Sequence, residues 1–128
     1  MDFKLNQAEA EEVFFNCLCD NDLYIHDLEI VSSDKLYERA RTNWIKLNDR
    51  QFPTIEDVWM QILRDGGKLG LKDWSRSEQL AVVTLEELQE RMSKAPSKNL
   101  INVLEGNYDV TDTDVILQTI FYGEVIFG

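Results

Sequence analysis

Cys17, Cys19 and His26 are the residues of this chain whose types come closest to a set of metal ligands. A zinc site normally has four ligands, and its cysteine pairs are usually spaced more widely than one intervening residue. On a helix, residues two positions apart point in directions that differ by about 200°, so they cannot easily hold one ion. We therefore expect no metal site, with Cys17 as a small core residue and Cys19 at a helix end.

The single histidine, His26, is followed directly by a carboxylate at Asp27. Acid–base or nucleophilic catalysis needs a base within hydrogen-bond reach of the group that it activates. Adjacent residues of a strand point to opposite faces, so Asp27 is poorly placed to orient His26. We expect a half-buried or strand-surface histidine, no catalytic residue, and a protein that is not an enzyme.

Two further patterns resemble ligand-binding loops without matching them. The glycine pair at residues 66–67 follows a predicted helix, whereas phosphate-binding loops use the N–H groups at the start of one. A calcium loop that begins at Asp109 needs a glycine at its sixth position and a glutamate at its twelfth, where this chain has Asp114 and Ile120. We interpret the glycines as a helix stop and the aspartates as turn and capping residues, and we expect no cofactor.

Basic residues around a predicted hairpin raise the possibility of nucleic-acid binding. Lysine and arginine side chains can reach phosphates while a tryptophan stacks on a base. The helix that precedes the hairpin carries several carboxylates, which phosphate repels. Nucleic-acid binding is therefore an alternative hypothesis with these candidate residues: Arg64, Lys68, Lys72, Trp74 and Arg76.

The formal net charge of −11 is concentrated at the two ends of the sequence. Residues 1–34 contain nine acids and one base, and residues 99–128 contain five acids and no base. Such a charge disfavours nonspecific attraction to nucleic acid or an anionic membrane. It permits a further alternative, an acidic DNA mimic that inhibits a nucleic-acid enzyme, with a surface that includes Glu9, Glu11, Glu12, Asp20 and Asp22.

The length of 128 residues and the 44% hydrophobic content suit a single domain over residues 1–128 with a packed core. The longest mainly apolar stretch, residues 115–127, is interrupted by polar residues and is too short to span a bilayer. No secretory signal pattern is present, and two cysteines do not make a disulfide framework. We expect a cytoplasmic protein without membrane contact.

Residues 54–85 carry the clearest secondary-structure pattern. Thr54 can cap a helix over residues 54–65, because its hydroxyl can accept an N–H bond of the first turn. The glycines at 66–67 then end the helix. Alternating residues after them, a polar run over 73–79 and an apolar run over 80–85 predict a strand, a loop and a second strand.

The flanking segments complete the predicted fold. We expect helices over residues 7–19, 34–48 and 85–95, a short helix that stops at Gly106, and a strand over residues 23–31. Residues 115–127 can form helix or strand, and the apolar spacing favours helix to about Tyr122. The fold class is thus α+β: a mostly helical domain with a small antiparallel sheet of strand 23–31 and hairpin 68–85.

The order helix, strand, helix, helix, strand, strand resembles that of a winged helix. The resemblance places a helix-turn-helix at residues 34–48, 49–53 and 54–65, and the wing at the loop 73–79. It is a resemblance of element order alone, and it covers residues up to 85.

Our leading functional hypothesis is a noncatalytic module that binds an unknown protein partner and can self-associate. The apolar C-terminal stretch carries it, because a large apolar patch at a chain end often marks an interface. The candidate interface residues are Phe121, Tyr122, Val125, Ile126 and Phe127. The alternative for this stretch is that it packs on the core of its own chain.

Overall fold

The computed structural model describes residues 4–76 and 80–127. Its elements are α1 (Gln7–Cys19), the 3₁₀ helix η1 (Leu23–His26), β1 (Leu28–Val31), α2 (Asp34–Asn48), α3 (Ile55–Arg64), β2 (Lys68–Asp73), β3 (Leu80–Thr84), α4 (Leu85–Met92), α5 (Ser97–Leu104) and α6 (Val110–Tyr122). The predicted α+β class is confirmed, since the described residues form mostly helix and a small antiparallel sheet. Of the loop predicted to be a wing, residues 77–79 lie outside the described residues.

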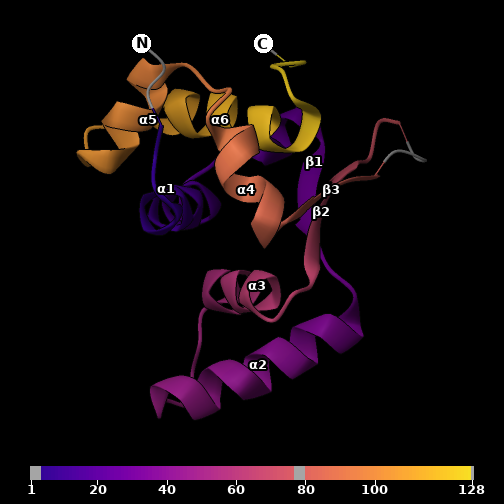
Figure 1. Cartoon of the computed structure of the whole chain (residues 1–128). Coiled ribbons are helices and arrows are strands. Elements are labelled where there is room, and N and C mark those ends of the chain that lie inside the picture. Colours follow the sequence, from indigo (N-terminus) through magenta and orange to yellow (C-terminus); the bar gives the residue numbers. More distant parts are fainter. Residues whose placement is uncertain (1–3, 77–79, 128) are drawn as a thin grey trace.

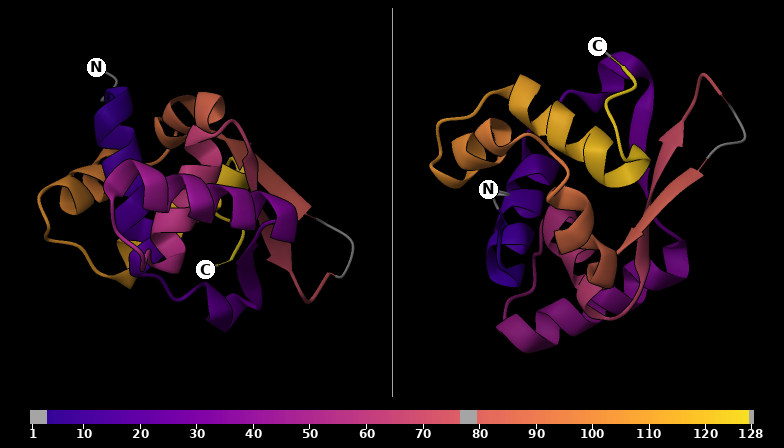
Figure 2. Two further views of the ribbon diagram at one scale, coloured as in Figure 1. Left: turned by 90° about the horizontal axis from the view of Figure 1, so that it is seen from below. Right: turned by 45° about the horizontal axis from the view of Figure 1, so that its top comes forward.

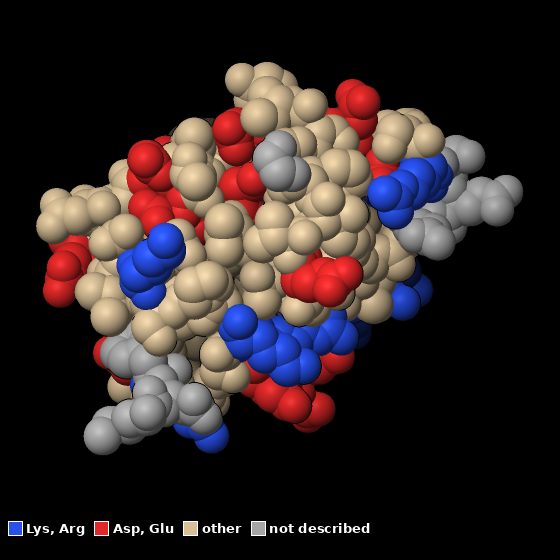
Figure 3. Space-filling model, turned by 90° about the horizontal axis from the view of Figure 1, so that it is seen from above, with Lys and Arg blue, Asp and Glu red and all other residues tan. Residues whose placement is uncertain are grey.

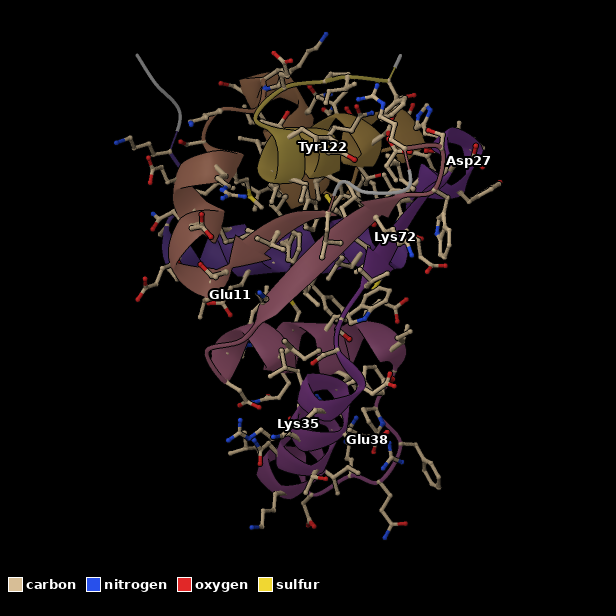
Figure 4. All side chains as sticks on the ribbon, turned by 90° about the vertical axis from the view of Figure 1, so that its right-hand side faces the viewer. Glu11, Asp27, Lys35, Glu38, Lys72 and Tyr122 are labelled. Carbon is tan, nitrogen blue, oxygen red and sulfur yellow. The ribbon has the colours of Figure 1, made fainter. Side chains whose placement is uncertain are left out.

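Strand β2 lies in the centre of the sheet, with β1 on one side and β3 on the other, and both pairings are antiparallel. The register places Glu29 of β1 opposite Lys72 of β2. In Figure 1, α1, α3 and α4 lie on one side of the strands, and Figure 4 views the strands from the opposite side. Figure 2 shows the β2–β3 hairpin, predicted at residues 68–85, extending beyond the helices.

The strand predicted over residues 23–31 is shorter than expected, and its first half is the 3₁₀ helix η1. Local hydrogen bonds explain the difference. The Asn21 side chain accepts a bond from the Leu23 N–H group, and Asp27 adopts a left-handed conformation with φ of 58° that directs its N–H group toward Leu23 O and Tyr24 O. Aspartate and asparagine tolerate such turns, so these bonds replace the first residues of the strand.

Side-chain caps define the starts of the helices where the sequence predicts them. Asn6, Ser33 and Thr54 each accept a bond from a backbone N–H group in the first turn of the helix that follows. Gly66, with φ of 87°, follows the end of α3, and the Gly67 N–H group donates to Ile62 O at 2.8 Å. The last helix begins earlier than the predicted residue 115, because Asp109 caps it and α6 starts at Val110.

The buried apolar side chains of the described residues form a single cluster between the helices and the inner face of the sheet. Helix α6 packs at its centre, and the rings of Phe14 and Phe121 have centroids 6.4 Å apart. Helix α2 is peripheral: its fully buried residue is Ala40, and Figure 1 shows it below α3. None of the described helices combines the length and the hydropathy needed to cross a membrane.

The start of α6 depends on the buried carboxylate of Asp112, which accepts bonds from Asn99 Nδ2, Asn102 Nδ2 and the Asp109 N–H group. Burial raises the pKa of Asp112, but these three bonds together with the positive charge of Lys98 outweigh it and hold the pKa below its ordinary value. The carboxylate therefore stabilises the fold fully above its unfolded pKa of about 4, and this contribution is lost as the pH falls through the lower folded pKa.

Asp112→Asn should lower the free energy of unfolding at pH 7 by about 1–3 kcal/mol, because its amide cannot accept all three bonds. Below about pH 4 the wild type should lose part of this advantage, so the two stability curves should converge. Urea denaturation from pH 7 to pH 3 measures this difference. A constant difference across that range would contradict the assignment of Asp112 as a charged cap.

Candidate functional site

A groove of about 460 Å³ runs beside β1, where the end of α1, η1 and the start of α3 meet. Most of its lining is apolar and includes Leu18, Leu23, Leu28 and Trp59. Tyr24 and Ile55 also line it and are 75% and 48% exposed. The groove thus combines a buried aliphatic floor with large accessible side chains, which is the composition of a binding site for an apolar group.

Two carboxylates, Glu29 of β1 and Glu56 of α3, also line this groove. Within the described part of the chain, neither of them forms an ion pair. The pKa of the Cys19 thiol, at the adjacent end of α1, is raised to about 11. Burial is the larger cause, and the negative charge of Glu56 raises it further. The groove therefore favours apolar ligands that also carry positive charge.

The edge of β1 that faces away from β2 carries unpaired backbone groups. The Trp74 N–H group donates to Asp27 O at 2.9 Å, so the backbone carbonyl of Asp27 points toward β2. The N–H and C=O groups of an antiparallel strand alternate in direction from residue to residue. Those of Glu29 and Val31 therefore also point toward β2, whereas those of Leu28 and Ile30 point toward the unpaired edge. Outside the strand ladder, the described residues supply no hydrogen bond to the N–H or C=O groups of Leu28 and Ile30.

At the opposite edge of the sheet, formed by β3, Arg91 bonds one backbone carbonyl. Arg91 of α4 donates from Nη1 to Val82 O at 2.7 Å and to Ile120 O at 3.2 Å. Its Nη2 bonds the carboxylate of Glu87. The Thr84 hydroxyl and then Arg91 keep the pKa of Glu87 below its ordinary value, so this carboxylate stays charged at neutral pH. Arg91 thus satisfies one outward carbonyl of the β3 edge, and the groove lies at the β1 edge.

Arg91→Ala should lower the free energy of unfolding by about 1–2 kcal/mol, because two backbone carbonyls lose a charged donor. Arg91→Lys should recover only part of this loss, since a lysine cannot reproduce the forked geometry of the guanidinium group. Thermal or urea denaturation of the three proteins measures both effects. Equal stability of Arg91→Ala and the wild type would show that the β3 edge does not depend on this cap.

The structure brings together most of the predicted nucleic-acid-binding residues. Lys68 and Lys72 lie on the same face of β2, four residues apart, and Lys72 Nζ lies 3.7 Å from the ring centre of Trp74. Arg76 Nε lies 3.6 Å from Asp73 Oδ2, and Arg64 lies apart on α3, where its Nε donates to Glu11 at 3.0 Å. Four of these five side chains, all except Lys68, thus already have a contact within the chain, and nucleic-acid binding stays a prediction.

The predicted interface residues of the C-terminal stretch fall into two groups. Phe121 is buried and Tyr122 is half-buried, while Val125 and Ile126 are exposed. Phe127 stacks on the ring of His26 with centroids 5.4 Å apart. The stretch therefore packs largely against its own chain, and a role in self-association stays a prediction for Val125 and Ile126.

The buried amide of Gln118 holds this C-terminal stretch in place. Its Oε1 accepts bonds from the Ile126 and Phe127 N–H groups, both at 2.8 Å, and its Nε2 donates to Phe127 O at 2.9 Å. A single side chain on α6 thereby satisfies three backbone groups of the segment that follows the helix. We did not predict this interaction from the sequence, in which Gln118 stands as a polar residue within an apolar run.

The residues first considered as metal ligands or catalysts are placed separately. His26 bonds Asp114 at 3.2 Å rather than its neighbour Asp27. Cys17 is buried, as predicted, and burial raises the pKa of its thiol far above the ordinary value. Within residues 4–76 and 80–127, no group of three or more histidine, cysteine, aspartate or glutamate side chains is arranged to hold a metal ion.

The acidic residues of α1 and of its C-cap are divided among several structural contacts. Glu9 accepts a bond from the Asn6 N–H group, Glu11 pairs with Arg64, and Asp20 accepts a bond from the Tyr108 hydroxyl at 2.7 Å. On the face seen in Figure 3, lysine and arginine side chains lie among the acidic ones. This face does not offer an unbroken acidic surface, and the acidic-mimic hypothesis gains no support from it.

The groove itself was not predicted from the sequence. Its lining comes from four separate segments, and Tyr24 lies in the 3₁₀ helix that replaces the start of the predicted strand 23–31. The available signal was the run of large apolar residues from Leu23 to Ile25 beside a turn. No protein-family model matches this chain, and neither a curated protein nor a solved structure matches it.

Proposed function

We propose that this chain is a noncatalytic protein–protein interaction module and that the groove beside β1 is its binding surface. The observation that supports this proposal is the groove itself, in which exposed Tyr24 and Ile55 lie beside buried aliphatic side chains. Large side chains that are accessible but partly held by the fold provide contact area at a low cost in side-chain entropy. The carboxylates of Glu29 and Glu56 then favour a partner with basic residues.

Two further features are part of this proposal. The chain can self-associate through the exposed side chains of Val125 and Ile126, which lie outside the groove. We place the module in the cytoplasm, because a reducing compartment suits its free cysteines, buried Cys17 and exposed Cys19.

Affinity capture from a lysate of the native host tests the groove. The wild type should retain specific proteins that the double variant Tyr24→Ser, Ile55→Ser loses. Leu47→Ser is the matched control, since Leu47 is 73% exposed on α2 and lies outside the groove. Capture that survives the double variant would overturn the groove as the binding surface.

Light scattering coupled to size-exclusion chromatography tests self-association. The variant Val125→Ser, Ile126→Ser keeps the backbone bond from Ile126 to Gln118 and removes two exposed apolar groups. If the tail mediates self-association, the wild type should exceed the mass of one chain and this variant should not. A strictly monomeric wild type would remove self-association from the proposal.

A further inference from the structure

We propose that β1 binds an extended segment of the partner as a fourth strand of the sheet, and that this segment alternates apolar residues with lysine or arginine. The inference rests on the proposed function of the groove and specifies how the partner binds. Strand addition at an exposed sheet edge is a general mode of peptide recognition, in which backbone bonds supply affinity and alternate side chains supply specificity.

The backbone of β1 provides the first argument. Leu28 and Ile30 present their N–H and C=O groups at the open edge, next to the groove that their side chains line. An edge of this kind is a template for another strand unless the protein covers it. Within the described residues the edge groups of Leu28 and Ile30 have no partner, and these two residues are only 3% and 8% exposed, so an added strand would satisfy backbone groups that lie largely out of solvent.

The side chains beside β1 define the chemistry of the added strand. Successive residues of that strand point to opposite faces of the sheet. Those directed toward the helices would lie beside Leu18, Ile55 and Trp59 and should be apolar. Those on the other face would lie beside Glu29, where an opposite charge in a directly facing pair is stabilising.

Charge also argues against a second copy of this chain as the occupant. If two β1 strands paired antiparallel through Leu28 and Ile30 of both, each Glu29 would face the Glu29 of the other copy. Like charges that face each other directly across strands are destabilising. A basic segment from a different protein avoids this repulsion, so charge complementarity favours it.

Hydrogen exchange of backbone amides, measured by NMR on the full chain, tests the inference with synthetic peptides. The first probe is a capped hexapeptide of alternating lysine and valine, and the second replaces lysine with glutamate. The third is the lysine peptide with a methyl group on each backbone nitrogen, which keeps the side chains but removes the hydrogen-bond donors. The lysine peptide should bind with a Kd of about 1 mM or tighter and slow exchange at Leu28 and Ile30 about tenfold at saturation. The glutamate peptide and the methylated peptide should neither bind in this range nor slow exchange at these two amides.

Charge reversal at Glu29 provides the specificity control. Glu29→Lys should weaken binding of the lysine peptide about tenfold and make the glutamate peptide the better ligand. Glu38→Lys changes the net charge equally on exposed α2, which Figure 4 shows well below Asp27 and Lys72, and it should leave the preference unchanged.

Three outcomes would overturn strand addition. The first is no response to the lysine peptide at about 1 mM. The second is equal binding of the methylated peptide with unchanged exchange at Leu28 and Ile30. The third is a free protein that is dimeric in light scattering with both amides already protected, which would identify a second copy as the occupant. Partner capture that still depends on Tyr24 and Ile55 would, in the first two cases, leave the proposed function standing.

Discussion

Replacing Phe121 with alanine should lower the free energy of unfolding by about 3–5 kcal/mol. Phe121 is 6% exposed and lies on α6, with its ring centroid 6.4 Å from that of Phe14 on α1. Removing the ring leaves a cavity between two central helices, because a packed core relaxes only partly around a deleted side chain. Guanidinium denaturation at a fixed pH measures the loss.

Two variants show whether Phe121 is a core residue or an interface residue. Phe121→Leu keeps part of the buried volume and should lose clearly less stability than Phe121→Ala. Val125→Ser replaces a side chain that is 47% exposed and should change stability by no more than about 0.5 kcal/mol. If Phe121→Ala kept its stability but altered the oligomeric state, Phe121 would belong to an interface.

Replacing Gln118 with alanine should cost about 2–4 kcal/mol, because three backbone groups of Ile126 and Phe127 lose their buried partner and a cavity forms. The stacking of Phe127 on His26 should weaken with it. Denaturation measures the stability, and amide exchange at Ile126 and Phe127 should become faster.

The matched control for this variant is Gln89→Ala. Gln89 Nε2 donates a single bond, to Leu5 O at 2.6 Å, so its loss should cost about 1 kcal/mol. Unchanged protection of the Ile126 and Phe127 amides in Gln118→Ala would show that other contacts hold the C-terminal stretch.

Elements with short-range signals were predictable from the sequence. The capping box of Thr54 and Asp57 and the left-handed Gly66 depend on residues within a few positions of each other. The same holds for the β2–β3 hairpin, whose two strands are neighbours in the chain. The start of α6 was predicted five residues late. Asp109, Asp112 and Asp114 are all suitable capping residues by type, and in the structure Asp109 and Asp112 form the capping box.

Features that depend on distant residues were not predictable. His26 bonds Asp114, which lies 88 positions away, while the sequence suggested only its neighbour Asp27. The unpaired edge of β1 follows from the strand order, since β1 pairs with β2 on one side and with no strand on the other among the described residues. The 3₁₀ helix η1 then places Tyr24 at the groove, a position that an extended strand would not give it.

Amide hydrogen exchange in the free protein tests most directly whether β1 offers an open edge beside the groove. Exchange at Leu28 and Ile30 should be at least about tenfold faster than at Glu29 and Val31, whose groups face β2. Equal protection of all four amides would contradict an unpaired edge at β1, and with it the binding of a partner strand at this edge.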